Sequence, residues 1–357
     1  MHQIPKLEKL PPKKEQVETI EILRQLAKSA QSLGELKGIA QTMPNQEMLV
    51  NAVVIQEAKD SSEIENIITT QDELYKALST KSRQDPQVKE VINYRKAILQ
   101  GYDLIKQQGF LKQKDLEFIQ HTLLENNAGI RSVPGTVLKN DKTGEVVYTP
   151  PQNKAEILEL LSNFLEHFNV NLEQTHPLIN LAILHYQFES IHPFYDGNGR
   201  TGRILNILYL IINDLLDVPI LYLSSYINKT KADYYKLLNG VNNKAEWEPY
   251  ILYILKGIEL TSLRTISKIQ SINQLLSDTI LAVQQQEPKI YRKELVELLF
   301  EHPYSKIENV VDKLNVERKA ASRYLNALEK IGILKSEKVG REIIYVNTKL
   351  IEILKTN

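Results

Sequence analysis

The sequence predicts a mainly α-helical protein with one β-hairpin and a small C-terminal domain. Apolar residues recur at intervals of three and four over most of the chain, which is the spacing of a helix with one buried face. The first 280 residues contain one clear β signal, two short apolar runs on either side of a turn-rich link near residue 140. Glu287-Pro288 then marks a boundary. We therefore expect an N-terminal helical region at 1–85, a central domain at 86–286 and a separate domain at 288–357.

Composition narrows the class of protein. The chain has 357 residues, which suits two or three domains, and its 44 lysines and arginines balance 44 aspartates and glutamates. No overall charge therefore favours nucleic acid or a membrane surface. The absence of cysteine excludes disulfides and thiolate metal sites and fits a reducing compartment. The N-terminus lacks a signal-peptide core, and the longest apolar run, Ile204–Ile212, is too short to span a bilayer. We expect a cytoplasmic protein without a membrane segment.

The N-terminal region predicts three helices. Helical spacing begins at Val17 and continues for about 25 residues. A second helix is expected at Glu47–Lys59. Asp60-Ser61-Ser62 offers N-cap side chains, which predicts a third, short helix at Ser61–Thr70 with Glu65 in its first turn.

Two further amphipathic helices, Pro86–Gln107 and Lys114–Asn126, precede the β signal. There Gly135–Leu138 and Glu145–Tyr148 flank the turn-forming residues Asn140–Gly144, which predicts a hairpin. A lone hairpin has free edges, and a free edge can bind an extended peptide as an added strand.

After a helix around residues 157–168, the pattern predicts a helix at Pro177–Ile191 and another at Arg200–Leu216. We expect His185 and Glu189, on the first of these, to make structural hydrogen bonds in the interior. Between the two helices lies the stretch HPFYDGNGRTGR, residues 192–203.

This stretch combines residues that bind and transfer phosphate groups. The turn at Gly197, Asn198 and Gly199 leads directly into the start of a helix. The unpaired N–H groups and the dipole at a helix start attract anions. Arg200 and Arg203 at a helix start oppose the dipole, which points to a bound polyanion. Asp196 can hold Mg²⁺ beside phosphates, and His192 can act as a general base. The alternative is a helix corner with a surface histidine and solvated arginines.

The stretch also resembles the signature of the Fic family, HxFx(D/E)GNGRxxR, at every specified position. The resemblance implies a helical core with a β-hairpin flap and a protein adenylyltransferase activity. In such a protein, AMP passes from ATP, bound with Mg²⁺ or Mn²⁺, to a Ser, Thr or Tyr hydroxyl of a target protein. His192 would be catalytic, Asp196 would bind the metal, and residues 197–200 with Arg203 would bind ATP.

A second resemblance lies upstream. One regulatory class of Fic proteins carries the motif (S/T)xxxE(G/N), which Ser61, Glu65 and Asn66 match. In that class the glutamate pairs with the second signature arginine, here Arg203, and prevents productive ATP binding. The alternative is that Glu65 is a solvated carboxylate near a helix start.

The remaining assignments by resemblance concern the flap and the nucleotide base. The hairpin resembles the Fic flap, which positions the target through a set of residues that are here Thr136, Val137, Leu138 and Tyr148. A YYxxLxxxN stretch that lines the adenine and ribose pocket of Fic proteins assigns Tyr234, Tyr235 and Asn242 to ATP. A surface hairpin without function and ordinary amphipathic tyrosines are the alternatives.

The C-terminal domain, 288–357, shows three helices followed by two short strands joined at Gly340, which is the order of a winged helix. It holds 14 Lys or Arg against 10 Asp or Glu, and Arg318, Lys319 and Arg323 fall on the presumed recognition helix. DNA docking and protein docking both fit this domain.

Two other functions stay open at this stage. The same site can remove AMP, with Glu65 orienting a water molecule. The chain can instead be a DNA-binding regulator whose Fic core senses a nucleotide. The family resemblance also admits self-modification and a homodimer.

Overall fold

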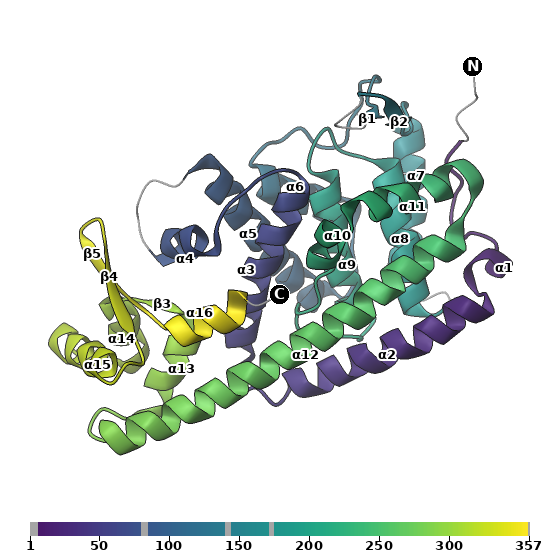
Figure 1. Ribbon diagram of the computed structural model, residues 1–357. Helices are drawn as coiled ribbons and strands as arrows, with labels where there is room; N and C mark the ends of the chain where they lie inside the picture. The colour runs from purple at the N-terminus through teal and green to yellow at the C-terminus, as the bar shows by residue number, and fades with distance from the viewer. Residues whose placement is uncertain (1–5, 80–84, 140–143, 171–174, 356–357) are drawn as a thin grey trace.

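The computed structural model of the chain describes residues 6–79, 85–139, 144–170 and 175–355. Helices dominate these residues and strands are few, so the predicted mainly α-helical fold is confirmed (Figure 1). None of the helices described has the length and apolar composition needed to cross a bilayer.

The elements up to residue 286 are helices and one short hairpin. The helices before the hairpin are α1 (Lys14–Val17), α2 (Ile20–Ala40), α3 (Gln46–Ile64), α4 (Gln71–Ser79), α5 (Pro86–Gln108) and α6 (Gln113–Leu124). The hairpin and the helices after it are β1 (Leu138–Lys139), β2 (Val146–Tyr148), α7 (Lys154–Asn169), α8 (Pro177–Ile191), α9 (Asn198–Ile212), α10 (Ser224–Lys229), α11 (Lys231–Lys244) and α12 (Trp247–Gln286).

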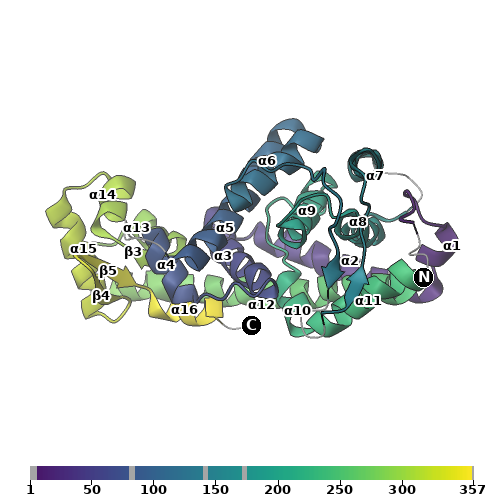
Figure 2. The ribbon, with the colours of Figure 1, turned by 90° about the horizontal axis from the view of Figure 1, so that it is seen from above.

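The long helix α12 connects the two ends of the molecule. It runs from the central domain to the C-terminal domain, and α2 lies beside it (Figures 1 and 2). The two helices approach closely, since the buried Ser29 of α2 donates a hydrogen bond to the carbonyl of Leu255 on α12 at 2.8 Å. The prediction of one helix from Val17 onward is wrong: the chain breaks after Val17, and the Thr19 side chain caps α2 by accepting from the Ile22 N–H at 3.3 Å.

At the centre, α8 is buried on nearly all sides, between α7, α9 and α12. A helix that is apolar all round belongs in an interior. The predicted bounds of α8 are confirmed. Helix α9 starts two residues before the predicted Arg200 and ends four residues before the predicted Leu216, since the chain turns at Asn213 and at Asp214, whose φ is 54°.

The N-terminal helices differ from the prediction at residues 60–70, the segment that contains Glu65. Ser61 and Ser62 are not N-caps of a new helix but part of the last turn of α3, and the next helix, α4, begins at Gln71. Glu65 is the C-cap of α3, and Asn66 follows in the left-handed region with φ 62°. The N–H of Asn66 bonds the carbonyl of Glu63, and the N–H of Ile67 that of Ser62, each at 3.0 Å. This is a Schellman C-cap, whose left-handed position favours Gly or Asn.

The hairpin is present but short. Leu138 pairs with Tyr148 and Lys139 with Val146, antiparallel. The remaining predicted strand residues on the first side, 135–137, lie outside the strand. Of the predicted turn, Asn140–Thr143 lies outside the described residues.

The C-terminal domain packs at one end of α12 (Figure 2). Its elements are α13 (Lys293–Glu301), β3 (Tyr304–Ser305), α14 (Ile307–Leu314), α15 (Arg318–Lys330), β4 (Lys335–Val339), β5 (Glu342–Val346) and α16 (Thr348–Lys355). The antiparallel sheet has the order β3-β5-β4, so β3 and α16 are additions to the predicted pattern. Tyr304 of β3 stacks on Tyr75 of α4 with ring centroids 5.3 Å apart, which ties this domain to the helix that follows Glu65.

Candidate functional site

The predicted phosphate-binding turn lies between α8 and α9, and its conformation depends on two left-handed residues. His192 ends α8 with φ 49°, and Gly197 starts α9 with φ 79°. Between them, the buried side chain of Asn198 accepts from the N–H of Phe194 and donates to its carbonyl, both at 2.8 Å. Asn198 therefore closes the turn, and the first N–H groups of α9 are left without partners in the helix, as at any helix start.

These elements surround a cavity of about 360 Å³. Most of the predicted catalytic and phosphate-binding residues meet there, together with two carboxylates from other helices; the lining residues are Glu65, Ile67, Glu90, His192, Tyr195, Asp196, Gly197, Asn198, Gly199 and Arg200. The cavity thus combines an imidazole, carboxylates and the positive end of a helix dipole.

His192 is held as a neutral base. Burial, and then the charge of Arg131, lowers the pKa of the imidazole to about 4. The ring is therefore unprotonated at neutral pH and can accept a proton without first losing one.

Arg131 holds the turn between α8 and α9 through hydrogen bonds to its backbone. Its side chain is fully buried, and its Nε donates to the carbonyl of His192 at 2.6 Å. Nη2 donates to the carbonyl of Ile191 at 3.2 Å and to that of Pro151, at the base of the hairpin. The backbone adds an N–H bond from Arg131 to the carbonyl of Pro193 at 2.9 Å. One cation thus links the turn between α8 and α9 to the base of the hairpin.

Asp196 suits a metal that arrives with a nucleotide. Its Oδ1 accepts from the N–H of Gly197 at 2.6 Å, and 73% of the side chain is exposed to solvent. The described residues contain no group of three or more side chains able to hold a metal ion by themselves. Mg²⁺ is commonly bound by one or two carboxylates plus substrate phosphates, so this single carboxylate fits such an ion.

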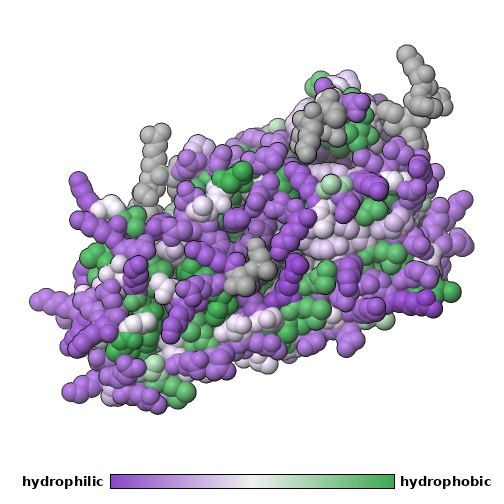
Figure 3. Space-filling view, viewed as in Figure 1, coloured by the Kyte–Doolittle hydropathy of each residue, from purple (hydrophilic) through white to green (hydrophobic). Residues whose placement is uncertain are grey.

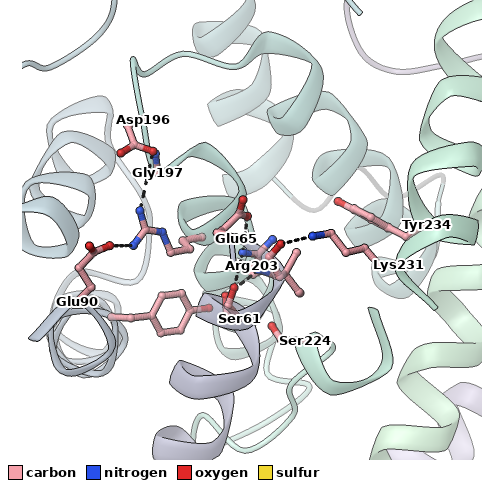
Figure 4. Close-up of polar contacts among 12 residues, drawn as sticks. Ser61, Glu65, Glu90, Asp196, Gly197, Arg203, Ser224, Lys231 and Tyr234 are labelled. Carbon is pink, nitrogen blue, oxygen red and sulfur yellow. Dashed lines mark hydrogen bonds and ion pairs between the residues drawn. The ribbon is translucent and has the colours of Figure 1, made fainter. Parts of the chain in front are cut away.

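Both signature arginines are paired with carboxylates from other helices, and Figure 4 shows Arg203 beside Glu65. Arg200 Nη1 lies 2.9 Å from Glu90 Oε2 of α5, and its Nη2 lies 3.9 Å from Asp196 Oδ1. Arg203 Nη2 lies 2.8 Å from Glu65 Oε1. The guanidinium groups are almost fully buried, so each carboxylate balances a cation that would otherwise be costly to keep away from water.

The end of α3 makes three hydrogen bonds with Arg203. Besides the Glu65 carboxylate, Arg203 donates from Nε to Ser61 Oγ at 2.7 Å and from Nη2 to the Ser61 carbonyl at 3.0 Å. Burial by itself would raise the pKa of Glu65, but the charge and hydrogen bond of Arg203 outweigh burial and lower it. Glu65 is therefore ionised at neutral pH.

Glu65 also lies directly over the start of α9. A Cβ on Gly199 would be 2.6 Å from Glu65 Oε1 and 3.0 Å from Arg203 Nη1. The carboxylate thus occupies space beside the N–H groups that would bind an anion. Lys231 of α11 holds this end of α3 in place, since its Nζ donates to the carbonyl of Ile64 at 2.5 Å (Figure 4).

The residues assigned to the nucleotide base lie outside the cavity lining. Tyr234 is buried and its hydroxyl bonds His185 Nε2 at 2.9 Å. Asn242 accepts from the hydroxyls of Tyr186 at 2.8 Å and Ser190 at 3.3 Å. Tyr235, in contrast, is 43% exposed and packs edge-on against Tyr234.

The four flap residues differ in exposure: Val137 is exposed, Thr136 and Leu138 are half-buried, and Tyr148 is buried. Val137 is 37% exposed, and the Thr136 carbonyl accepts from Gln152. Tyr148 is buried, and its hydroxyl donates to the carbonyl of Ser190 at 3.1 Å. Its side chain therefore anchors the hairpin to α8 rather than facing outward, while Leu138 is its strand partner.

Of the two polar residues expected to have structural roles on α8, His185 makes the predicted hydrogen bonds, to Tyr234 and, through Nδ1, to Asn206 at 3.1 Å. Glu189 differs. Its buried Oε1 has no hydrogen-bond partner within the described residues, and burial raises its pKa to about 7. The carboxyl packs on the backbone of α9, since a Cβ on Gly202 would lie 2.5 Å from Oε1.

Sequence reasoning missed the contact of Glu90 with Arg200 and the role of Arg131 beneath His192. Arg131 could have been suspected as an arginine close to the flap, but no local signal reveals that it is fully buried. Glu90 sits on an ordinary amphipathic helix, and only the packing of α5 against α9 brings it to the site.

Three segments of the chain match described protein families. Residues 23–103 match the Fic/DOC family N-terminal region, residues 110–210 match the Fic/DOC family itself, and residues 275–350 match the C-terminal domain of SoFic-like protein adenylyltransferases. The two Fic/DOC segments together cover more than half of the chain.

Curated relatives and solved structures agree with these matches. A probable protein adenylyltransferase of Aquifex aeolicus is 31% identical over 173 residues, which is 47% of this chain and 51% of the relative. Protein adenylyltransferase fic-1 of Caenorhabditis elegans is 32% identical over 134 residues, 37% of this chain and 24% of the relative. The chain thus matches about half or less of the length of these relatives.

Among solved structures, a Fic family protein from Desulfovibrio desulfuricans G20 superposes with a TM-score of 0.60 at 19% identity, over 94% of this chain and 98% of the other. Residues 134–508 of Fic-1 from C. elegans superpose with a TM-score of 0.54 at 20% identity, over 70% of this chain and 73% of the other. At these identities the likeness shows a shared fold.

Proposed function

Because the chain belongs to the Fic/DOC family, we propose that it is a protein adenylyltransferase, which transfers AMP from ATP to a Ser, Thr or Tyr hydroxyl of a target protein. The observation that carries this proposal is the single cavity that joins His192, Asp196 and the start of α9. The relatives named as protein adenylyltransferases support the same activity.

The phosphates of ATP would lie at the N-terminus of α9. The N–H groups there, with the helix dipole, stabilise negative charge that develops on the α-phosphate. Arg200 and Arg203 bind the outer phosphates. Mg²⁺ or Mn²⁺ bound with ATP would be held by Asp196 and would neutralise phosphate charge.

His192 is the general base. It accepts the proton of the target hydroxyl, whose oxygen forms a bond to the α-phosphorus while the bond from that phosphorus to the bridging oxygen of the β-phosphate breaks. Pyrophosphate leaves with the electron pair. The neutral imidazole suits this role, and Arg131 keeps it neutral and correctly placed. The exposed edge of the hairpin would align the target segment as an added strand.

Glu65 inhibits this reaction. Its carboxylate holds Arg203 and fills the space beside Gly199, so an outer phosphate must displace it before ATP can bind productively. Two negatively charged groups cannot share this position without repulsion. The free chain is therefore in an inhibited state, and a change that moves the end of α3 would activate it.

Intact-mass analysis tests the proposal. Glu65→Gly protein is incubated with ATP and Mg²⁺, alone and with a lysate fraction as the source of targets, beside the wild type. We expect mass increases of one AMP unit, on the protein or a target, that are larger for the variant. Glu63→Gly is the matched control, because Glu63 lies two residues away, in the last turn of α3, and pairs with Lys59 instead of Arg203.

The His192→Ala change in the Glu65→Gly background should abolish the mass increase, since an aligned base contributes about 10²–10⁴-fold to the rate. Equal labelling with and without His192 would refute the catalytic assignment. Equal labelling by the Glu65→Gly and Glu63→Gly proteins would remove Glu65 from the inhibitory role while leaving the activity itself intact.

A further inference from the structure

The C-terminal domain presents a helix–turn–helix unit at the outer end of the molecule. Helices α14 and α15 are joined by three residues, the first of which, Asn315, has φ 50°. Short links of three or four residues are typical of this unit, whose second helix enters the major groove in DNA-binding proteins. Strands β4 and β5 follow and turn at Gly340, with φ 61°, and the N–H of Ser336 at the start of β4 donates to Glu329 of α15 at 2.7 Å.

The acidic side chains around α15 and this turn are mostly engaged elsewhere. Glu308 pairs with Arg318, and the carboxylate of Glu329 accepts from the N–H of Ser336 at 2.7 Å. Glu337 lies 3.2 Å from Lys76 of α4, and Glu342 lies 2.7 Å from Lys306.

Most other basic side chains of the same region are exposed and make no ion pair within the described residues. Six cations make no ion pair or side-chain hydrogen bond within the described part of the chain: Lys319, Arg323, Lys330, Lys335, Lys338 and Arg341. The guanidinium of Arg323 rests only against the ring of Tyr324, at 5.6 Å. Among the described residues Glu317 has no ion pair and Glu329 accepts only from a backbone N–H, but the six unpaired cations outnumber these two acids, so the surface carries a positive field that the balanced composition of the chain conceals.

The outward face of α15 carries residue types that contact base edges. Lys319, Ser322 and Arg323 follow at helical spacing, and Lys319 and Arg323 are exposed, while the Oδ1 of Asn326 one turn on accepts from the Tyr345 hydroxyl at 2.7 Å. Lysine and arginine pair with guanine. This row has no apolar anchor of the kind that centres a protein–protein interface. The outer margin of this end of the molecule is hydrophilic, with hydrophobic residues also reaching the surface there (Figure 3), and Ile343 of β5 is 52% exposed.

We propose that this face binds duplex DNA, with α15 in the major groove and the β4–β5 turn on the flanking phosphates. The helix has 13 residues, about 20 Å at 1.5 Å per residue, and the major groove admits a helix of ordinary diameter. Lys319 and Arg323 face the bases, and Lys338 and Arg341, beside Gly340, face phosphates. The proposal is independent of AMP transfer, because it involves no residue of the catalytic cavity.

Fluorescence anisotropy with the full chain and a labelled mixed-sequence duplex of about 30 base pairs, titrated at several salt concentrations, tests this. The slope of log K against log salt is about −0.9 for each phosphate neutralised. Lys338→Ala/Arg341→Ala should therefore weaken binding and make the slope shallower by about 1.8, whereas Lys319→Ala/Arg323→Ala should weaken binding through lost base contacts with little change in slope.

Lys349→Ala/Lys355→Ala is the matched control. It removes the same charge from α16, which packs on α12 and α3, and should leave the slope unchanged. All four positions of the test variants are exposed, so thermal unfolding should stay at the wild-type value. The His192→Ala protein should bind DNA like the wild type.

Three results would overturn the proposal: no binding to the duplex at low salt, an equal loss in the control variant, or a slope that neither test variant changes. If the test variants instead lose binding to an acidic protein while the duplex never binds, the face is a protein-docking surface and the DNA assignment is wrong.

Discussion

Replacing Glu65 by glycine should increase the proposed AMP transfer by an amount that the structure allows us to estimate. The carboxylate makes one charged hydrogen bond to Arg203 at 2.8 Å, and 35% of the Glu65 side chain is exposed. A hydrogen bond between charged groups contributes about 1.5–3 kcal/mol, and partial exposure favours the lower end. ATP must displace this hydrogen bond before it can bind productively. Each 1.4 kcal/mol removed from that cost raises kcat/KM about tenfold. We expect kcat/KM for ATP to rise about 10- to 100-fold.

The same change should lower stability in the absence of nucleotide. Arg203 is almost fully buried and would keep only its two bonds to Ser61. Leaving a buried charged group partly unpaired costs about 1–3 kcal/mol in the free energy of unfolding. Saturating ATP with Mg²⁺ should restore much of it, because a ligand that binds only the folded state stabilises it.

Steady-state kinetics with labelled ATP and denaturant unfolding with and without nucleotide measure both effects. Glu65→Gln, which keeps an acceptor without the charge, should fall between the wild type and Glu65→Gly in rate. Because the pKa of Glu65 lies below its usual 4.5, inhibition should not weaken between pH 6 and 8. The reasoning would be refuted by a Glu65→Gly protein that loses stability but gains no rate, since the carboxylate would then be structural only.

Three further predictions concern the turn and its neighbours. In the Glu65→Gly background, kcat/KM should be flat from about pH 6 to 8 and fall only toward the free-enzyme pKa of His192, about 4, which loss of the Glu65 charge lowers further; a break near 6.5 would contradict this. Arg131→Gln removes the charge that lowers this pKa, so the acid limb of the pH profile should move to higher pH, and an unmoved limb would exclude electrostatic control by Arg131. Gly202→Ala should cost about 1–3 kcal/mol by overpacking against the Glu189 carboxyl, and Glu189→Ala should recover most of this cost; additive losses in the double variant would show that the two residues do not interact.

Helix periodicity predicted the interior helices well, because burial of their apolar residues determines where they form. The bounds of α8 and the turn that follows it were readable from spacing and glycine placement alone. The hydrogen bonds of Asn198 and the left-handed φ of His192 were not, since both depend on how two helices meet.

The end of α3 was misread for a physical reason. Serine and aspartate can cap a helix start or occupy a helix interior, so Asp60, Ser61 and Ser62 look like an N-cap when taken locally. In the structure Ser61 stays helical and bonds Arg203, 142 positions away in the sequence, and Asn66 supplies the left-handed residue that ends the helix. The motif match placed Glu65 correctly where local capping rules did not.

Contacts between segments that are distant in the chain could not be predicted from the sequence. Glu90 pairs with Arg200 across 110 positions, and Arg131 reaches His192 across 61. No local pattern marks either residue, because each is defined by the packing of elements that are remote in the chain. The predicted domain limits and the roles of Tyr234, Tyr235 and Asn242 stay predictions.

The most direct measurement follows the label from two forms of ATP into protein. With the Glu65→Gly chain and a target-containing lysate, label in the α-phosphate should enter protein and label in the γ-phosphate should not, and the added His192→Ala change should abolish transfer. Incorporation from the γ-labelled form, or undiminished α-label transfer without His192, would contradict AMP transfer by this site.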